Sequence, residues 1–202
     1  MLENTDKKAQ IIEAADNLFH RYGYSKTSLD DIAGDAGLGK GTIYYYFESK
    51  EEIFMETVRQ HSEVFYQTLK KRISEETSFE NKFSMAIRLP IKLANEHAPI
   101  LLDEIKNIPS NYLHKLDSFR ENNKLRMSKI LREILEQGYE QKILSTSVSV
   151  EKLVAIIYDW FLLGDSNIII KNPDVFIKKA ETDYEIIVQI MLNGILKGGN
   201  QI

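Results

Sequence analysis

The segment from Ser28 to Phe47 restricts the fold of this chain more than any other feature. A small residue, Ala33, is followed four positions later by Gly37 and then, six positions further on, by the apolar Ile43. Two short helices that cross steeply need a small side chain where their backbones meet and a glycine that can adopt positive φ in the turn. They also need an apolar anchor on the second helix. This spacing is typical of a helix-turn-helix, whose second helix enters the major groove of DNA.

Capping signals predict where the helices around this segment begin. Ser28 precedes Asp31 by three residues, and Ser49 precedes Glu52 by three residues. A serine that accepts from a first-turn amide, and an acid that reaches back to the serine amide, satisfy two otherwise unpaired donors. A helix is therefore expected after each serine, and Gly23 is expected to end the preceding one. The periodicity of that first helix gives it an apolar face made of Ile11, Ala14, Ala15, Leu18, Phe19 and Tyr22.

Three consecutive tyrosines, Tyr44 to Tyr46, follow on the second helix of the motif. Successive residues of a helix point about 100° apart, so a helix of about two turns cannot bury all three rings on one face. Tyrosine hydroxyls reach phosphates, and the rings pack on sugars and thymine methyl groups. Gly39 and Gly41 allow the start of this helix to approach a groove closely. The alternative is that the tyrosines are ordinary interfacial aromatics.

The charge balance excludes a protein that coats nucleic acid through bulk attraction. The net charge is −4, and residues 1–50 contain six Lys and Arg against eight Asp and Glu. DNA binding would therefore depend on a local surface with strong salt dependence. Lys26, Lys40 and Lys50 flank the proposed docking face.

Helical periodicity continues through the rest of the chain, and no convincing pair of alternating strands is visible. The pattern predicts an all-α fold of about nine helices. It divides into an N-terminal helix-turn-helix DNA-binding domain at 1–50 and a second helical domain at 51–202, for which the resemblance described below implies ligand binding and dimerisation. Helices are expected at about 6–22, 28–36, 40–47, 49–73, 79–95, 98–108, 110–137, 149–170 and 179–196.

Composition removes several classes of protein. The absence of cysteine excludes disulfide scaffolds, Cys-ligated metals and thiol chemistry, and it suits a reducing cytoplasm. Residues 1–8 are polar and lack the apolar core of a secretory signal. The most apolar stretch, 153–170, contains 13 hydrophobic residues in 18 but is interrupted by polar ones, so a buried helix is favoured over a membrane span. The four histidines lack metal-ligand spacing, and neither a metal nor a cofactor is expected.

The stretch from Ile11 to Phe54 resembles the DNA-binding domain of the TetR family of bacterial regulators. The motifs A-x-x-L-F, G-Y-x-x-T-S, I-A-x-x-A-G, G-T-I-Y-x-Y-F and S-K-E-E-I-F all occur in order. The resemblance implies an all-helical fold of about nine helices, with a C-terminal domain that dimerises and holds a small inducer. It also implies phosphate contacts at Thr27 and Ser28, major-groove contacts at Lys40, Gly41, Thr42 and Tyr45, and flanking phosphate contacts at Tyr44 and Lys50.

The remaining residues give two weaker predictions. Aromatic side chains with few polar tips suit an amphipathic ligand, and two strongly apolar C-terminal helices suit pairing with a second copy of the chain. Plain intramolecular core is the alternative in both cases. The candidate ligand-binding residues are Phe65, Ile87, Ile105, Tyr112, Phe119, Asn123, Met127 and Tyr158. The candidate dimer-interface residues are Trp160, Leu163, Gly164, Ile187, Ile190, Met191 and Gly194.

These features predict a cytoplasmic, ligand-responsive transcriptional regulator. It is expected to be a repressor that binds a palindromic double-stranded DNA operator as a homodimer and is released by a small hydrophobic or amphipathic effector. An architectural or cell-division factor of the same fold, without a small ligand, is the alternative. An enzyme is not expected, because the sequence has no phosphate-binding glycine loop, metal cluster or nucleophile with an adjacent base.

Overall fold

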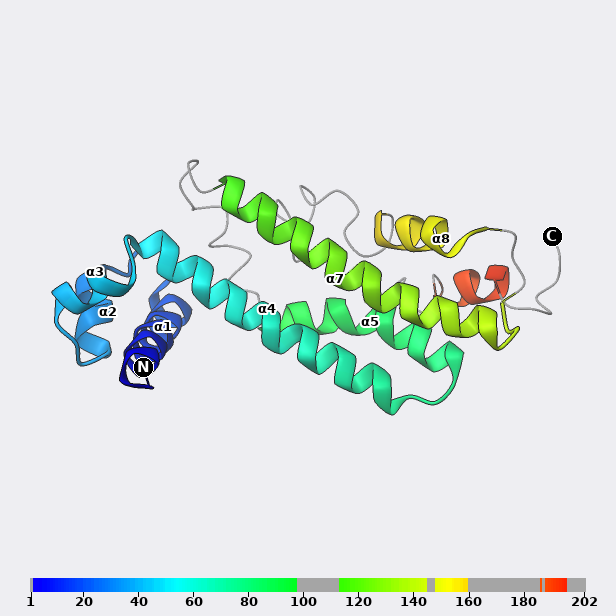
Figure 1. Cartoon of the computed structure of the whole chain (residues 1–202), viewed down its shortest axis with the longest axis horizontal. Helices are drawn as coiled ribbons and strands as arrows, with labels where there is room; N and C mark the ends of the chain where they lie inside the picture. Colours follow the sequence, from blue (N-terminus) through cyan, green and yellow to red (C-terminus); the bar gives the residue numbers. More distant parts are fainter. Residues whose placement is uncertain (1, 98–112, 145–147, 160–185, 187, 196–202) are drawn as a thin grey trace. The chain divides into compact units, whose positions relative to one another are not determined.

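The structure is a computed structural model of the chain, and it describes residues 2–97, 113–144, 148–159, 186 and 188–195. These parts are predominantly helical, in agreement with the all-α fold expected from the periodicity (Figure 1). The helices are α1 (Leu2–Tyr22), α2 (Leu29–Asp35), α3 (Lys40–Tyr46), α4 (Lys50–Glu75), α5 (Phe79–His97), α7 (Leu113–Glu140) and α8 (Val150–Ile157), and residues 188–195 are also helical.

The chain divides into two compact units. The first comprises Met1–Val64 and Pro99–Asp117, and the second comprises Phe65–Ala98 and Ser118–Ile202. The helix α4 begins in the first unit and ends in the second. The expected domain boundary at residue 50 stays a prediction.

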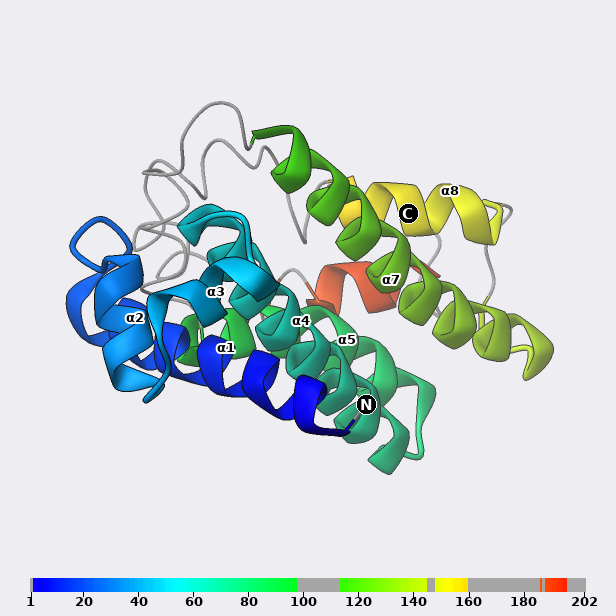
Figure 2. The ribbon, with the colours of Figure 1, turned by 60° about the vertical axis from the view of Figure 1, so that its left-hand side comes forward.

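In the first unit, α2 packs against both α1 and α3 (Figure 2). The core of this unit consists of the apolar face of α1 together with residues from the three helices that follow. Tyr22 shares that face in the sequence pattern but is 53% exposed, because α1 ends at this residue. The buried hydrophobic residues are Ile11, Ile12, Ala14, Ala15, Leu18, Phe19, Tyr24, Ile32, Ala33, Ile43, Phe47, Ile53, Phe54 and Val58.

The turn between α2 and α3 has the geometry that its sequence predicts. Gly37 adopts φ +64°, a conformation in which a Cβ would be strained. The amide of Leu38 donates to the carbonyl of Ala33 at 2.9 Å, which closes the end of α2. Ile43, the expected anchor of the second helix, is fully buried. The helix-turn-helix is therefore present, with α3 as its second helix.

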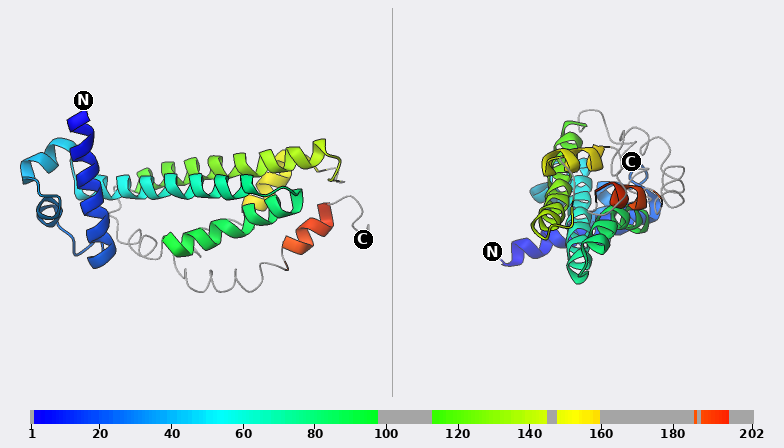
Figure 3. Two further views of the ribbon diagram at one scale, coloured as in Figure 1. Left: turned by 90° about the horizontal axis from the view of Figure 1, so that it is seen from below. Right: turned by 90° about the vertical axis from the view of Figure 1, so that its right-hand side faces the viewer.

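The second unit contains the C-terminal part of α4 together with α5, α7 from Ser118 onward, and α8 (Figure 3). Gly138 of α7 lies against Phe79, the first residue of α5, and a Cβ added at Gly138 would lie 2.7 Å from the ring of Phe79. The centre of the core is formed by Leu69, Phe83, Ile87, Leu131 and Leu135, all fully buried.

Within the described residues, no helix is both long and apolar enough to span a membrane. The apolar stretch at 153–170 is described only as far as residue 159. In the described part, Leu153, Val154, Ile157 and Tyr158 are buried.

Candidate nucleic-acid interface

The helix α3 has one apolar face and one open face. Ile43 and the following Phe47 are buried, whereas Tyr44 is 52% exposed and Tyr45 is 74% exposed. The rings of Tyr45 and Tyr46 meet edge to face, with centroids 5.0 Å apart. Ile43 and Phe47, four residues apart, therefore pack into the core. The side chains of Tyr44 and Tyr45 remain exposed to solvent.

Space is also open at the N-terminal end of α3. Gly39 is the N-cap in extended conformation, and no atom lies within 4 Å of a Cβ built at Gly39 or at Gly41. Both glycines are exposed, as is Lys40, while Thr42 is half-buried. This surface, defined by residues 39–42 together with Tyr44 and Tyr45, is called the α3 face below. It brings together five of the residues implied to contact DNA, which are Lys40, Gly41, Thr42, Tyr44 and Tyr45.

The N-terminus of α2 has the expected capping box. The Ser28 hydroxyl accepts from the Asp31 amide at 3.1 Å, and the Asp31 carboxylate accepts from the Ser28 amide at 2.9 Å. The Ser28 hydroxyl also donates to the same carboxylate. Hydrogen bonds from the side chain and backbone of Ser28 lower the pKa of Asp31. The cap keeps this end of α2 rigid while Ser28 itself stays exposed.

Lys40 does not stand alone on the α3 face. Its amine lies 2.8 Å from a carboxylate oxygen of Asp30, and both side chains are more than half exposed. The hydrogen bond to Asp30, with the charge of that carboxylate, raises the pKa of Lys40. An exposed pair of this kind is weak and is readily exchanged for another anion.

Thr27 and Lys50 lie in a different environment from the α3 face. Thr27 is 3% exposed, and its hydroxyl donates to the carbonyl of Gly23 at 2.9 Å. The Lys50 amine donates to the carbonyls of Tyr24 and Thr27, at 2.8 and 2.9 Å. A phosphate contact by either side chain would require it to leave these intramolecular partners. Their implied role at DNA stays a prediction.

The second capping signal also appears, with one difference. The Ser49 hydroxyl accepts from the Glu52 amide at 3.2 Å, as expected. The Glu52 carboxylate, however, accepts from the amide of Glu48 at 2.8 Å, one residue before the cap. The start of α4 is nevertheless fixed by side chains on both sides of Lys50.

The ion pair between His61 and Asp16 was not predicted from the sequence. His61 on α4 lies 2.7 Å from Asp16 on α1, and each side chain is about 40% exposed. The hydrogen bond to Asp16 raises the pKa of His61 against the opposing effect of partial burial. The two residues are 45 positions apart, so no local spacing could have revealed the contact. Among the residues that the structure describes, no group of three or more His, Cys, Asp or Glu could hold a metal.

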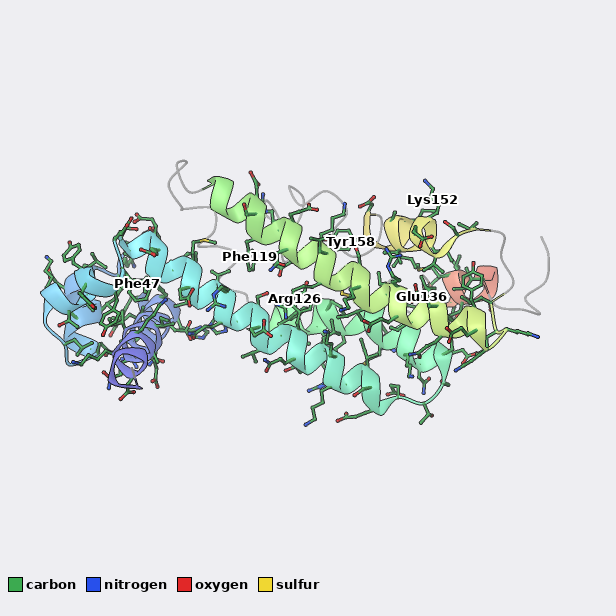
Figure 4. All side chains as sticks on the ribbon, viewed as in Figure 1. Phe47, Phe119, Arg126, Glu136, Lys152 and Tyr158 are labelled. Atoms are coloured by element: carbon green, nitrogen blue, oxygen red, sulfur yellow. The ribbon has the colours of Figure 1, made fainter. Side chains whose placement is uncertain are left out.

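In the second unit, the candidate ligand-binding residues are partly buried and partly accessible. Tyr158, Ile87 and Met127 are buried, while Phe65, Phe119 and Asn123 are half-buried. Ile105 and Tyr112 lie outside the described residues. Phe119, Arg126 and Tyr158 are labelled in Figure 4.

Two contacts between a cation and a tyrosine ring, which the sequence analysis did not predict, involve residues of this region. The guanidinium of Arg126 lies over the ring of Tyr66, 4.2 Å from its centroid, and the Tyr66 hydroxyl donates to the carbonyl of Asn123 at 2.8 Å. The Lys124 amine lies 5.3 Å from the ring centroid of Tyr158. Burial raises the pKa of Tyr158 to about 12. Both tyrosines are therefore neutral at physiological pH.

The candidate dimer-interface residues are described only in part. Ile190 is 66% exposed, Met191 is half-buried, and Gly194 is exposed with no atom within 4 Å of a Cβ placed on it. A large apolar side chain in this position is what a helix that pairs with another copy would show. Trp160, Leu163, Gly164 and Ile187 lie outside the described residues.

Comparison with known proteins decides what the N-terminal unit is. Residues 11–57 match the family model of bacterial regulatory proteins of the tetR family. The chain carries a TetR-family DNA-binding domain. The matched residues run from the first buried position of α1 to the first turns of α4, and they include the whole helix-turn-helix.

A curated relative is also a regulator. The chain is 29% identical over 112 residues to the fatty acid metabolism regulator protein of Bacillus subtilis, a match that covers 55% of this chain and 58% of that protein. The chain thus spans little more than half the length of this curated relative.

Solved structures extend the likeness to the whole fold. A putative TetR-family regulator from Mesorhizobium loti has a TM-score of 0.72 and 22% identity, and the match covers 96% of this chain and 98% of that one. The transcriptional regulator FadR from Bacillus subtilis, solved in complex with stearoyl-CoA, has a TM-score of 0.62 and 19% identity, with 96% and 99% covered. At these identities the likeness concerns the fold alone.

Proposed function

We propose that the chain is a transcriptional regulator that binds operator DNA through the α3 face. The observation that carries the proposal is the 74% exposure of Tyr45 beside Lys40 and the open glycines, on the second helix of a helix-turn-helix. In this reading Lys40, Gly41, Thr42 and Tyr45 enter the major groove, and Ser28 and Tyr44 meet the flanking phosphates.

The regulator would act as a dimer in the cytoplasm. One helix-turn-helix reads only a few base pairs, so a two-fold protein on a palindromic operator is the expected arrangement. The exposed Ile190 and the open Gly194 support a pairing surface in the C-terminal helix. Repression is the proposed outcome, because a dimer bound across an operator blocks access to the same DNA.

A small hydrophobic or amphipathic effector would bind in the second unit. The neutral, buried Tyr66 and Tyr158 supply apolar rings, and Arg126 over Tyr66 supplies a cation for the polar end of such a ligand. The fatty acyl-CoA bound by the Bacillus subtilis FadR is a ligand of this class. By population shift, a ligand that prefers one position of α4 would lower operator affinity in proportion to its differential affinity for the two states.

The docking face is tested with Tyr45→Ala. DNA that the wild-type protein selects from a random-sequence pool serves as the ligand, and binding is measured by fluorescence anisotropy at fixed salt. Loss of a groove-facing aromatic should weaken binding by about tenfold or more. Tyr22→Ala is the control, because it removes another exposed tyrosine, one that lies at the end of α1 and outside the α3 face. Equal affinities for wild type and Tyr45→Ala would remove the α3 face from the proposal.

The effector is tested by thermal unfolding in the presence of fatty acids, acyl-CoA thioesters and other amphipathic metabolites. A ligand that binds only the folded chain raises its melting temperature with concentration. It should also release the selected DNA. If no compound stabilises the protein while DNA binding is intact, the regulator works without a small effector.

A further inference from the structure

The loop that connects α1 to α2, residues 23–28, is held to the first residue of α4. Lys50 donates from its amine to two carbonyls of this loop, those of Tyr24 and Thr27, at 2.8 and 2.9 Å. The same amine lies over the ring of Tyr24, 4.2 Å from its centroid. A residue at the start of one helix is thus bonded to a loop more than twenty positions earlier in the chain.

The loop is stiff where Lys50 holds it. Thr27 is buried and bonded to Gly23, whose φ is +85°. The ring of Tyr24 packs edge to face on Phe54, with centroids 5.0 Å apart, and Phe54 belongs to the second turn of α4. Hydrogen bonds from an ammonium group are stronger than neutral ones, so the two bonds from Lys50 and the ring contact fix this loop to α4.

The loop ends at the capping residue of α2. Thr27, whose carbonyl accepts from Lys50, is followed directly by Ser28, which caps α2 and stays exposed. The backbone that Lys50 holds is therefore the backbone that sets the position of the α2 N-terminus.

We propose that Lys50 is a positioning residue that couples α4 to the N-terminus of α2, and that it acts on DNA binding through Ser28 instead of by touching a phosphate. A displacement of the first turn of α4 then moves the capping residue with it. The inference rests on the proposed function in that the Ser28 end of α2 is taken to meet DNA. In this proposal, the affinity for DNA depends on the position of the first turn of α4.

The geometry favours this role over a direct phosphate contact. To reach a phosphate, the amine would leave both carbonyls and the ring of Tyr24. The carbonyl of Thr27 belongs to a residue that is 3% exposed, so it would lose a charged partner in a place with little access to water. Lys40, whose partner is an exposed carboxylate, loses far less when it turns to DNA.

The first arm of the test uses the free protein. In Lys50→Met, which keeps the length of the side chain but removes the donors, hydrogen exchange at the amides of residues 24–28 should accelerate by about tenfold or more. Lys26→Met is the matched control, because it removes the same charge from an exposed position in the same loop. Lys50→Arg retains donors and should keep exchange close to wild type, which separates loss of the bonds from general damage.

The second arm uses selected DNA over a range of salt. Lys50→Met should bind more weakly than wild type, with an unchanged slope of log affinity against log salt. Lys50→Arg should recover most of the affinity. A slope that falls by about 0.9 per half-site would show a lost phosphate contact. That slope, or loop exchange in Lys50→Met within about twofold of wild type, would overturn the proposal. Failure of the wild-type protein to bind any DNA would instead refute the proposed function, while the exchange arm would still report on the contact itself.

Discussion

Asp30 holds Lys40 on the α3 face, and its removal should strengthen DNA binding. The two side chains lie 2.8 Å apart, and the hydrogen bond and charge of Asp30 raise the pKa of Lys40. Under the proposed function, with Lys40 in the major groove, the DNA phosphates would compete with Asp30 for the same ammonium group and would also be repelled by the carboxylate. In Asp30→Asn, the competing anion is gone while the size of the side chain is kept.

The size of the effect on DNA affinity and on its salt dependence follows from one Lys40–Asp30 pair in each half-site. If Lys40 is partly neutralised in the wild type, freeing it adds up to one phosphate-neutralising cation per half-site. The slope of log affinity against log salt should then steepen by up to about 0.9 per half-site, or about 1.8 for a dimer. Both side chains are exposed, so the pair is weak, and the gain in affinity at low salt should reach at most about fivefold per half-site. Between about 50 and about 200 mM salt, the steeper slope would reduce affinity by up to about tenfold more than in the wild type.

The assay is fluorescence anisotropy with selected DNA at several salt concentrations. Asp35→Asn is the matched control, because it removes the same charge from the opposite, C-terminal end of α2. Tighter binding with a steeper slope in Asp30→Asn alone supports the reasoning. Weaker binding in Asp30→Asn would show that the carboxylate orients Lys40 for DNA, and the argument from competition would be wrong.

Three further predictions concern stability. Gly34→Ala should raise the free energy of unfolding by about 0.5–1 kcal/mol, since nothing lies within 4 Å of the new Cβ. Gly138→Ala should lower it by up to about 2 kcal/mol, because the contact with Phe79 at 2.7 Å costs more than the helix propensity returns. Urea denaturation of both variants measures the two signs, and equal signs would contradict the packing argument. The His61 pair, whose folded pKa is raised, should stabilise the fold fully below about pH 6.5 and lose its effect as pH rises through the folded value. Because both side chains are about 40% exposed, the pair should contribute less than about 1 kcal/mol to the free energy of unfolding. The difference in this free energy between the wild type and Asp16→Asn should become smaller as the pH rises.

Local signals in the sequence predicted the N-terminal unit well. The capping pair of Ser28 and Asp31, the turn at Gly37 and the anchor at Ile43 all depend on residues within a few positions of one another. Their geometry is set by the backbone of one or two helical turns, so spacing alone determines it. Tyr22 shows where this reasoning stops, because periodicity places it on the apolar face, yet in the last position of α1 its side chain is 53% exposed.

Contacts between distant residues could not be read in the same way. The resemblance implies a phosphate contact for Lys50, and that contact stays a prediction, but no local spacing indicates that its amine donates to carbonyls of the loop after α1. Likewise, His61 pairs with Asp16, and Arg126 lies over Tyr66. Each contact depends on the angle and position at which two helices cross. The hydrophobic pattern shows only which face of each helix is buried, so it does not determine that crossing. Long cations reach several partners from the same backbone position, so their side chains are the hardest part of a site to predict.

The distribution of cations in the first unit explains how an acidic domain could still respond to DNA and to an effector. Arg59 is paired with Glu56, and Lys40 is paired with Asp30, so neither charge is fully available before DNA arrives. An exposed pair can exchange its acid for phosphate at low cost, whereas the two carbonyl bonds of Lys50 cannot be given up as easily. Under the proposed function, the lysine that turns toward DNA supplies salt-dependent attraction, and the lysine that stays in place supplies alignment. An effector that shifts the first turn of α4 then weakens operator binding through alignment alone, without contacting any residue of the α3 face.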